Sequence, residues 1–399
     1  MRGIPFLLGG LAMLGPFSID TYLPAFPAIA TDLQASPMQV QQTLTVYIAM
    51  FAFMILWHGS ISDALGRRKV IIAGLVCYVF ASLFCAFATS IEMLWIGRAM
   101  QGMVGGVGFV VGRAVVRDLY DGPQAQRLMA HVAVIFAIAP VAAPVIGGQL
   151  QHYFNWNGVF FFLAFLSAFL LLASWRYLPE TLPQEKRQSF SPGPLWRGYR
   201  AIFSSAEFCL LSLALAANFA GFFIYVMSSP VFLIQHLKLT PESFAWMFGP
   251  MVCGMMMGSI LNGRLAGKLS PQRTVMFGFA VMTTASAGNI ALNYLLPPQL
   301  PWAIAPLFVY VAGMALTMPC LQLLAMDLFP QRHGTASSCQ GMIQAGLNAL
   351  VAGLVVPLLW SSTLTLAFGM AGFMSLGLLA FCLANRRRTS GKQLVQQLR

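Results

Sequence analysis

The chain has 399 residues, of which 58% are hydrophobic and only 9% are charged, and its formal net charge is +12. So little polar surface cannot solvate a globular protein of this length, which excludes a soluble protein and places the chain in lipid. The positive charge does not indicate nucleic-acid binding, because all but three of the 23 Lys and Arg residues fall in termini or loops on one predicted side of the membrane.

Twelve apolar segments follow one another along the chain, and each is long enough to cross about 30 Å of hydrocarbon as a helix. They cover residues 4–27, 40–58, 70–88, 93–115, 128–150, 158–178, 206–230, 243–263, 274–294, 302–323, 336–359 and 363–384. The first segment contains Asp20 and several prolines and lacks a clear cleavage site, so we expect a retained span and not a signal peptide.

These segments predict an all-α polytopic membrane protein with twelve transmembrane helices in two six-helix bundles. We expect the bundles to cover residues 3–178 and 204–385, joined by a cytoplasmic linker at 179–203 and followed by a basic cytoplasmic tail at 386–399. The distribution of Lys and Arg places both termini in the cytoplasm, and Arg386 to Arg388 are expected to anchor the tail at anionic lipid.

The loop after the second segment, Gly59 to Val70 (GSISDALGRRKV), places four charged residues within twelve positions between two apolar segments. Gly59 and Gly66 are expected to allow close approach and a sharp turn. Asp63 is expected either to cap a helix or to pair with a neighbouring arginine, while Arg67, Arg68 and Lys69 hold the turn at the headgroups. An ordinary basic turn is the alternative. Gly258 to Leu269 (GSILNGRLAGKL) is a weak echo of this loop after the eighth segment, consistent with duplicated halves.

This loop resembles the signature of the major facilitator superfamily, Gly-x-x-x-Asp-x-x-Gly-Arg-Arg/Lys. More narrowly, the chain is similar to the Bcr/CflA drug:proton antiporters in FSIDTYLPAFPAI at Phe17 to Ile29 and GRAVVRDLY at Gly112 to Tyr120. IGRAMQGMVGG at Ile96 to Gly106 resembles the fourth-helix motif of the superfamily. APVIGG at Ala143 to Gly148 resembles its fifth-helix antiporter motif, with alanine in place of the first glycine.

Asp20 is the one acidic residue well inside a predicted span, where a carboxylate costs about 2.5 to 3.5 kcal/mol on insertion scales. A carboxyl group that is disfavoured by burial and favoured by a nearby cation can bind and release a proton. We therefore predict that Asp20 is the principal proton-coupling residue. A structural hydrogen bond or ion pair that stabilises the first helix is the alternative.

Arg98 is the other interior charge of interest, and the fourth-helix resemblance implies a proton-linked role for it. Physically, a fixed cation there could stabilise an ionised carboxylate, although direct pairing with Asp20 does not follow from the sequence. The alternative is that Arg98 extends to the outer headgroups.

Gating residues are predicted in the charged loop, at the inner end of the fourth span and in the fifth span, where proline and glycine give a thin, interrupted helix. Arg113 and Arg117 are expected to pair with Asp63 or Asp118. The full set is Gly59, Asp63, Gly66, Arg67, Arg68, Arg113, Arg117, Asp118, Pro140, Pro144, Gly147 and Gly148.

Polar and aromatic residues at helical spacing within apolar spans predict the substrate-binding faces. The candidates are Met13, Phe17, Tyr47, Asn218, Phe222, Tyr225, Gln340, Gln344 and Asn348. The many Met and Phe residues suit an adaptable apolar wall.

The expected function is proton-coupled multidrug efflux by alternating access across the bacterial cytoplasmic membrane. The partners would be a small amphipathic drug-like substrate, protons and the lipid bilayer, with no nucleic acid, and we expect a monomer. No Gly-x-x-x-x-Gly-Lys-Ser/Thr loop, metal-ligand cluster or disulfide framework occurs, so neither a cofactor nor a metal is expected. A proton-coupled importer or exporter of a small metabolite on the same fold is the alternative function. A membrane enzyme is a further rival, but the converging catalytic groups that it requires are not found in the sequence.

Overall fold

The computed structural model describes residues 3–120, 122–187, 192–329 and 332–397, and these residues are organised almost entirely as helices. The first part of the chain contains α1 (Ile4–Asp20), η1 (Leu23–Ala25), α2 (Phe26–Asp32), α3 (Pro37–Leu65), α4 (Arg67–Ala86), α5 (Ile91–Gly105), α6 (Val107–Leu119), α7 (Gly122–Phe154), α8 (Asn157–Tyr177) and η2 (Gln184–Lys186). The second part contains α9 (Pro192–Phe203), α10 (Ala206–Met227), η3 (Pro230–His236), η4 (Pro241–Phe244), α11 (Ala245–Leu265), α12 (Pro271–Leu295), α13 (Ala305–Met326), α14 (His333–Leu350), η5 (Val351–Val355), α15 (Val356–Leu359) and α16 (Thr363–Gln397).

Ten helical segments of the described residues are long and apolar enough to cross a membrane. The two predicted spans outside this set, 128–150 and 243–263, are occupied by the long helices α7 and α11. The chain is therefore a multi-pass, all-helical membrane protein, as its composition predicts.

The chain divides into two compact units. The N-terminal unit consists of Met1–Ser191 with Thr240–Ala245, and the C-terminal unit consists of Pro192–Leu239 with Trp246–Arg399. The division falls within the predicted linker at 179–203. The second half of that linker is the helix α9, which packs on α14 and α10 of the C-terminal unit and buries Tyr199 and Ile202.

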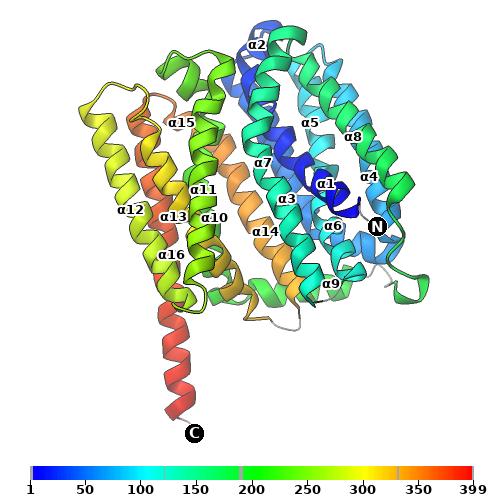
Figure 1. Ribbon diagram of the computed structural model, residues 1–399, viewed down its shortest axis with the longest axis vertical. Helices are drawn as coiled ribbons and strands as arrows, with labels where there is room; N and C mark the ends of the chain where they lie inside the picture. Colours follow the sequence, from blue (N-terminus) through cyan, green and yellow to red (C-terminus); the bar gives the residue numbers. More distant parts are fainter. Residues whose placement is uncertain (1–2, 121, 188–191, 330–331, 398–399) are drawn as a thin grey trace. The chain divides into compact units, whose positions relative to one another are not determined.

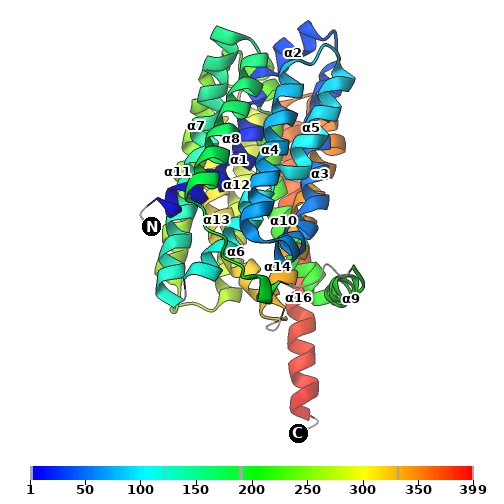
Figure 2. The same ribbon diagram turned by 90° about the vertical axis from the view of Figure 1, so that its right-hand side faces the viewer.

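In the N-terminal unit, α3 lies along α5, α4 lies along α8 and α1 lies along α7 (Figure 2). Close approach in this unit depends on a glycine stripe formed by Gly102, Gly105 and Gly108. A Cβ atom at Gly102 or Gly105 would collide with the carbonyl oxygen or the hydroxyl group of Tyr47 on α3, and one at Gly108 would collide with the carbonyl oxygen of Leu11 on α1. The missing side chains therefore set the depth to which α5 and α6 pack into this unit.

In the C-terminal unit, α10 lies along α16 and α13, and α12 lies along α13 and α16 (Figure 1). The last helix continues past the predicted span to Gln397, so the predicted tail at 386–397 is helical over the described residues and extends beyond the neighbouring helices of its unit. Good helix formers such as Arg, Lys, Gln and Leu follow the apolar part, and no proline interrupts them.

Several predicted spans are broken helices. The first stops at Asp20 and resumes through η1 and α2, and the fourth is divided at Gly106 between α5 and α6. The eleventh passes through the π-helical segment η5 before α15. Irregular backbone at these depths is tolerated in membrane proteins where protein surrounds it or it lines an aqueous cavity.

Candidate functional site

Asp20 is the last residue of α1 and lies at the break in the first span. The amide and the hydroxyl group of Thr21 both donate to the carbonyl oxygen of Phe17, at 3.2 and 2.5 Å. Pro24, which follows in η1, has no amide hydrogen to continue an α-helical ladder. Gly147 of α7 packs directly on the Thr21 backbone, where any Cβ atom would overlap it. The break and the glycine together hold the Asp20 backbone in place.

The Asp20 side chain is buried, since only 6% of the residue is exposed. Within the described part of the chain, no hydrogen bond or ion pair joins the Asp20 carboxyl group to another residue. An ionised carboxylate in this setting lacks the compensation that buried charges normally require, and protonation removes the cost. The structural hydrogen bond or ion pair considered as an alternative role for Asp20 is therefore not observed among these residues.

Arg98 on α5 is fully buried in the N-terminal unit. Its guanidinium group donates to Oε1 of Gln101 at 2.7 Å and to the carbonyl oxygen of Ser18 at 3.0 Å. The Cζ atom lies 4.4 Å from the ring centroid of Tyr47 and 4.7 Å from that of Tyr22. The alternative in which Arg98 extends to the headgroups is therefore wrong, because neutral acceptors and aromatic faces hold the cation inside the unit.

A chain of polar contacts leads away from Arg98 through the unit. Gln101 donates to Oγ of Ser82 at 2.8 Å, Ser82 donates to the carbonyl oxygen of Tyr78 at 2.8 Å, and the Tyr78 hydroxyl group is hydrogen-bonded to Ser18. The chain returns to the residue whose carbonyl oxygen accepts from Arg98, so α1, α4 and α5 share one buried network. Ser18, Ser82 and Tyr78 were not predicted from the sequence, because serine and tyrosine are common in membrane spans and the partners of these residues lie far away in the chain.

The substrate-binding candidates of the N-terminal unit differ in burial. Phe17 is buried, with its ring centroid 6.0 Å from that of Phe162, whereas Met13 is partly exposed. Tyr47 is buried against Arg98, and its hydroxyl group has no hydrogen-bond partner among the described residues. The Tyr47 ring therefore lies directly against the guanidinium group of the buried Arg98.

On α10 of the C-terminal unit, two of the three candidates have partners inside the unit. Asn218 donates to Thr317 on α13 at 2.5 Å, and the Tyr225 hydroxyl group accepts from Asn289 on α12 at 2.8 Å. Phe222 is buried, with its ring centroid 5.4 Å from that of Phe219. Asn218 and Tyr225 thus tie α10 to its neighbours.

On α14, Gln340 and Asn348 are buried and Gln344 is partly exposed. Nε2 of Gln340 and Oδ1 of Asn348 have no hydrogen-bond partner in the described parts of the chain. Of the predicted substrate residues in this unit, these two carry polar atoms that are free to receive a ligand, as does Oδ1 of Asn218.

The predicted loop from Gly59 to Val70 is not a loop, because α3 continues to Leu65 and only Gly66 separates it from α4. The charged residues at this junction are organised around Arg67, the first residue of α4. Arg67 forms an ion pair with Asp63 at 2.5 Å and with Asp118 at 3.1 Å, and it donates to Oγ of Ser62 at 2.6 Å. The backbone amide of Arg67 donates to Glu180 at 2.9 Å, where the carboxylate meets the start of the helix. We call Ser62, Asp63, Arg67, Asp118 and Glu180 the Arg67 cluster.

The sequence prediction for these charges was partly wrong. Asp118 pairs with Arg67, not with Arg113 or Arg117, because α4 begins beside the end of α6. The Arg113 guanidinium group lies 3.9 Å from the ring centroid of Phe109, one turn earlier in α6, and Arg117 is exposed. Arg68 donates to the carbonyl oxygen of Trp175 at 2.6 Å.

The two glycines of the loop behave differently. Gly66 has a φ angle of +101° and packs against the Glu180 carboxylate, so it makes the sharp turn that the sequence predicts. No described atom lies within 4 Å of where a Cβ atom of Gly59 would stand, because α3 continues past it with that face open. The close approach expected at Gly59 is not observed. Glu180 was missed because 113 residues separate it from Arg67.

The fifth predicted span is one long helix, α7, with Pro140 and Pro144 inside it. The prolines do not end the helix. Gly147 and Gly148 are buried, and it is Gly147 that lets α7 approach the backbone beside Asp20.

The comparisons with known proteins agree with this arrangement. The family model described as Major Facilitator Superfamily matches residues 8–352. The chain is 32% identical over 354 residues to an uncharacterized MFS-type transporter of Bacillus subtilis named YdgK, with 88% of both chains covered. It is 26% identical to a bicyclomycin resistance protein homolog of Haemophilus influenzae, with 96% of both covered. It is 28% identical to the multidrug resistance protein MdtL of Escherichia coli, with 84% of this chain and 83% of the relative covered.

Solved structures show the same arrangement of helices. A D-xylose-proton symporter superposes with a TM-score of 0.75 at 12% identity, covering 96% of this chain and 97% of the other. The human organic anion transporter MFSD10 superposes with a TM-score of 0.71 at 18% identity, covering 96% and 99%. At these identities the likeness concerns the fold alone.

Proposed function

Since this chain belongs to the major facilitator superfamily of membrane transporters, we propose that it is a Bcr/CflA-type drug:proton antiporter of the bacterial cytoplasmic membrane, with both termini in the cytoplasm. The protein has the all-helical fold of that superfamily and acts in transport, not as an enzyme. Relatives named for bicyclomycin and multidrug resistance, at 26% and 28% identity, support the drug-like class of substrate.

The observation that carries this proposal is Asp20, a buried carboxyl group at a helix break with no partner among the described residues. Broken helices near the membrane midplane are where secondary transporters place coupling groups. Proton binding relieves the cost of the buried charge, and proton release restores a carboxylate that can attract a cationic or polar substrate group. Substrate and proton thereby compete for one residue.

Arg98 has a supporting role in this proposal. Its charge is permanent and is held by Ser18, Gln101 and the aromatic rings of Tyr22 and Tyr47, with no ion pair to Asp20. Arg98 therefore keeps the α1 backbone in register two residues before Asp20. It acts on coupling by positioning, through Ser18, and not by forming and breaking a salt bridge.

Alternating access, with one proton entering for each substrate expelled, is energetically sufficient for resistance. One charge that crosses 100 mV releases about 2.3 kcal/mol, which sustains roughly a 50-fold gradient of a neutral drug.

The test uses proteoliposomes with an imposed pH difference and a panel of amphipathic drugs, comparing the wild type with Asp20→Asn. Asp327→Asn is the matched control, since Asp327 is an exposed acid near the end of α13. We expect Asp20→Asn to lower the rate of proton-driven drug transport at least ten-fold, and the control to behave as wild type.

Undiminished uphill transport by Asp20→Asn would refute the proposal. Transport of a small metabolite in place of every drug on the panel, with the same dependence on Asp20, would instead support the metabolite carrier on the same fold.

A further inference from the structure

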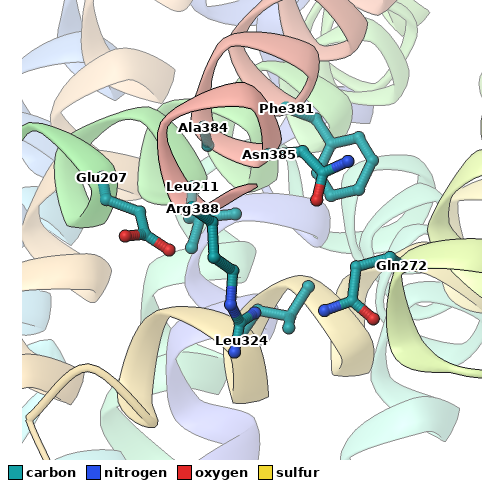
Figure 3. Close-up of a pocket in the computed structure, with 8 residues that line it drawn as sticks. All are labelled: Glu207, Leu211, Gln272, Leu324, Phe381, Ala384, Asn385 and Arg388. Carbon is teal, nitrogen blue, oxygen red and sulfur yellow. The ribbon is translucent and has the colours of Figure 1, made fainter. Parts of the chain in front are cut away.

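A narrow recess at one end of the C-terminal unit collects polar side chains outside the sites described above. Figure 3 shows Glu207, Gln272 and Arg388 arranged around it from α10, α12 and α16. The recess has room for about one water molecule, so it admits no larger ligand. The buried polar side chain whose surroundings have a consequence for transport is His58, on α3 of the N-terminal unit.

His58 contacts the break in the fourth span. α5 ends at Gly105 and α6 begins at Val107, so the last carbonyl groups of α5 have no partner within that helix. One of them belongs to Met103, and its oxygen accepts a hydrogen bond of 3.0 Å from Nε2 of His58. A side chain of α3 thus satisfies a backbone group that the break in the neighbouring span leaves over.

The His58 ring occupies space that Gly106, the residue at the break, leaves open. A Cβ atom at Gly106 would lie 3.3 Å from Nδ1 of His58 and 3.0 Å from the ring of Phe51, which is also on α3. Because a carbonyl oxygen only accepts, Nε2 of His58 carries the hydrogen of the bond to Met103. Nδ1 is buried and has no hydrogen-bond partner among the described residues. The contribution of His58 at the break is therefore a single donated hydrogen bond.

One face of α3 follows both halves of the fourth span. Toward one end of this face, Tyr47 stacks on Arg98 of α5. Toward the other end, Ser62 belongs to the Arg67 cluster, which also contains Asp118 of α6. His58 lies between these two contacts, at spacings close to whole helical turns from each. An unbroken helix of 29 residues therefore runs beside a broken span and contacts it on both sides of the break.

We propose that His58 is a positioning residue for transport: its hydrogen bond to Met103 fixes the angle between α5 and α6. α5 carries Arg98, which holds the backbone two residues before Asp20, and α6 carries Asp118 of the Arg67 cluster. A fixed angle makes the two halves of the span move as one piece. The inference rests on the proposed function only where it assigns proton coupling to Asp20.

Two variants separate the donated hydrogen bond from the ring that donates it. His58→Gln replaces the ring with an amide group that can donate to the same carbonyl oxygen and cannot change its charge. His58→Phe keeps a flat ring and removes the donor. His58→Leu removes the donor without enlarging the side chain, and it takes the place of His58→Phe if that variant does not fold.

Transport kinetics in proteoliposomes, normalised to folded protein, give the first readout. We expect His58→Phe to lower kcat by about five-fold or more and to leave KM within about two-fold of wild type, because substrate contacts are unchanged. His58→Gln should retain kcat within about two-fold of wild type. His236→Phe is the matched control, since His236 makes an equivalent 3.0 Å bond from Nε2 to the carbonyl oxygen of Trp360 in the C-terminal unit, and it should pump as wild type.

The angle between α5 and α6 gives the second readout. Spin labels are placed at Ile96 on α5 and Arg117 on α6, both exposed, as non-canonical amino acids, so that the native cysteines remain. Their distance distribution is measured by pulsed electron paramagnetic resonance in the full-length protein without drug or proton gradient. His58→Phe should broaden the distribution clearly, and His58→Gln should give the wild-type width.

Each of three results would overturn the proposal. The first is a wild-type kcat or a wild-type distance distribution in the variant that lacks the donor. The second is His58→Gln failing as severely as His58→Phe, which would assign the effect to packing of the ring. The third is an equal loss of kcat in His236→Phe. The spin-label measurement involves neither drug nor protons, so its outcome is independent of whether Asp20 couples transport to protons.

Discussion

Replacing Arg67 with glutamine tests whether the Arg67 cluster holds the N-terminal unit together. The Arg67 side chain is 9% exposed and contacts Asp63, Asp118 and Ser62, so the variant leaves Asp118 with the Thr181 hydroxyl group, at 2.9 Å, as its remaining partner.

The magnitude follows from the exposure of each partner. Asp63 is four residues away on the chain and its side chain is 40% exposed, so that pair contributes at most about 0.5 kcal/mol. The Asp118 side chain is 21% exposed, and a charge-assisted hydrogen bond in such a setting, together with the buried bond to Ser62, contributes about 1.5 to 3 kcal/mol. We expect Arg67→Gln to lower the free energy of unfolding by about 2 to 3.5 kcal/mol.

The assay is equilibrium unfolding of the purified protein in mixed micelles, with Arg68→Gln as the matched control. Among the described residues, Arg68 donates one side-chain hydrogen bond, to the Trp175 carbonyl oxygen, so Arg68→Gln should lower the free energy of unfolding by about 1 kcal/mol or less. A double-mutant cycle between Arg67→Gln and Asp118→Asn should show a coupling of about 1.5 kcal/mol. Equal losses for Arg67→Gln and Arg68→Gln, or additive effects in the cycle, would refute the reasoning.

Two further predictions concern the surroundings of Asp20. Gly147→Ala should lower the free energy of unfolding by about 1 to 3 kcal/mol, because the new methyl group overlaps the Thr21 backbone. The control is Gly59→Ala, whose methyl group meets open space and should be neutral or slightly stabilising in a thermal melt. Equal melting temperatures for the two variants would contradict the packing at Gly147. Arg98→Lys should slow transport and lower stability by about 2 kcal/mol, since lysine keeps the charge but loses the planar group that binds Ser18 and Gln101 and stacks on Tyr47. Normal pumping by that variant would show that charge alone is sufficient at this position.

The class of fold was predictable because twelve long apolar segments leave few alternatives for a chain in lipid. The burial of Asp20 was predictable for a similar reason, since an acidic residue surrounded by apolar sequence stands out; its proton-coupling role remains a prediction. The break at Asp20 was less so, because the prolines at 24 and 27 predict irregularity without giving the residue at which the helix ends.

The partners of the buried charges were not predictable. Arg98 is held by a backbone carbonyl oxygen, a glutamine and aromatic faces, none of which stands out in a span. Asp118 pairs with Arg67, although Arg113 and Arg117 were expected as its partners, because the packing of α4 against α6 decides which arginine reaches the carboxylate. Local patterns identify which residues need partners, and tertiary packing supplies them.

The glycine stripe has a consequence for anyone who compares this chain with its relatives. Gly102, Gly105 and Gly108 admit no side chain because a neighbouring backbone or hydroxyl group already fills the space. Selection would then keep these three positions as glycine even in a transporter that no longer carried its substrate or coupled to protons. Invariance at these positions reports how closely two helices must pack, and mutational scans scored on transport alone would mistake a folding requirement for a part of the transport mechanism.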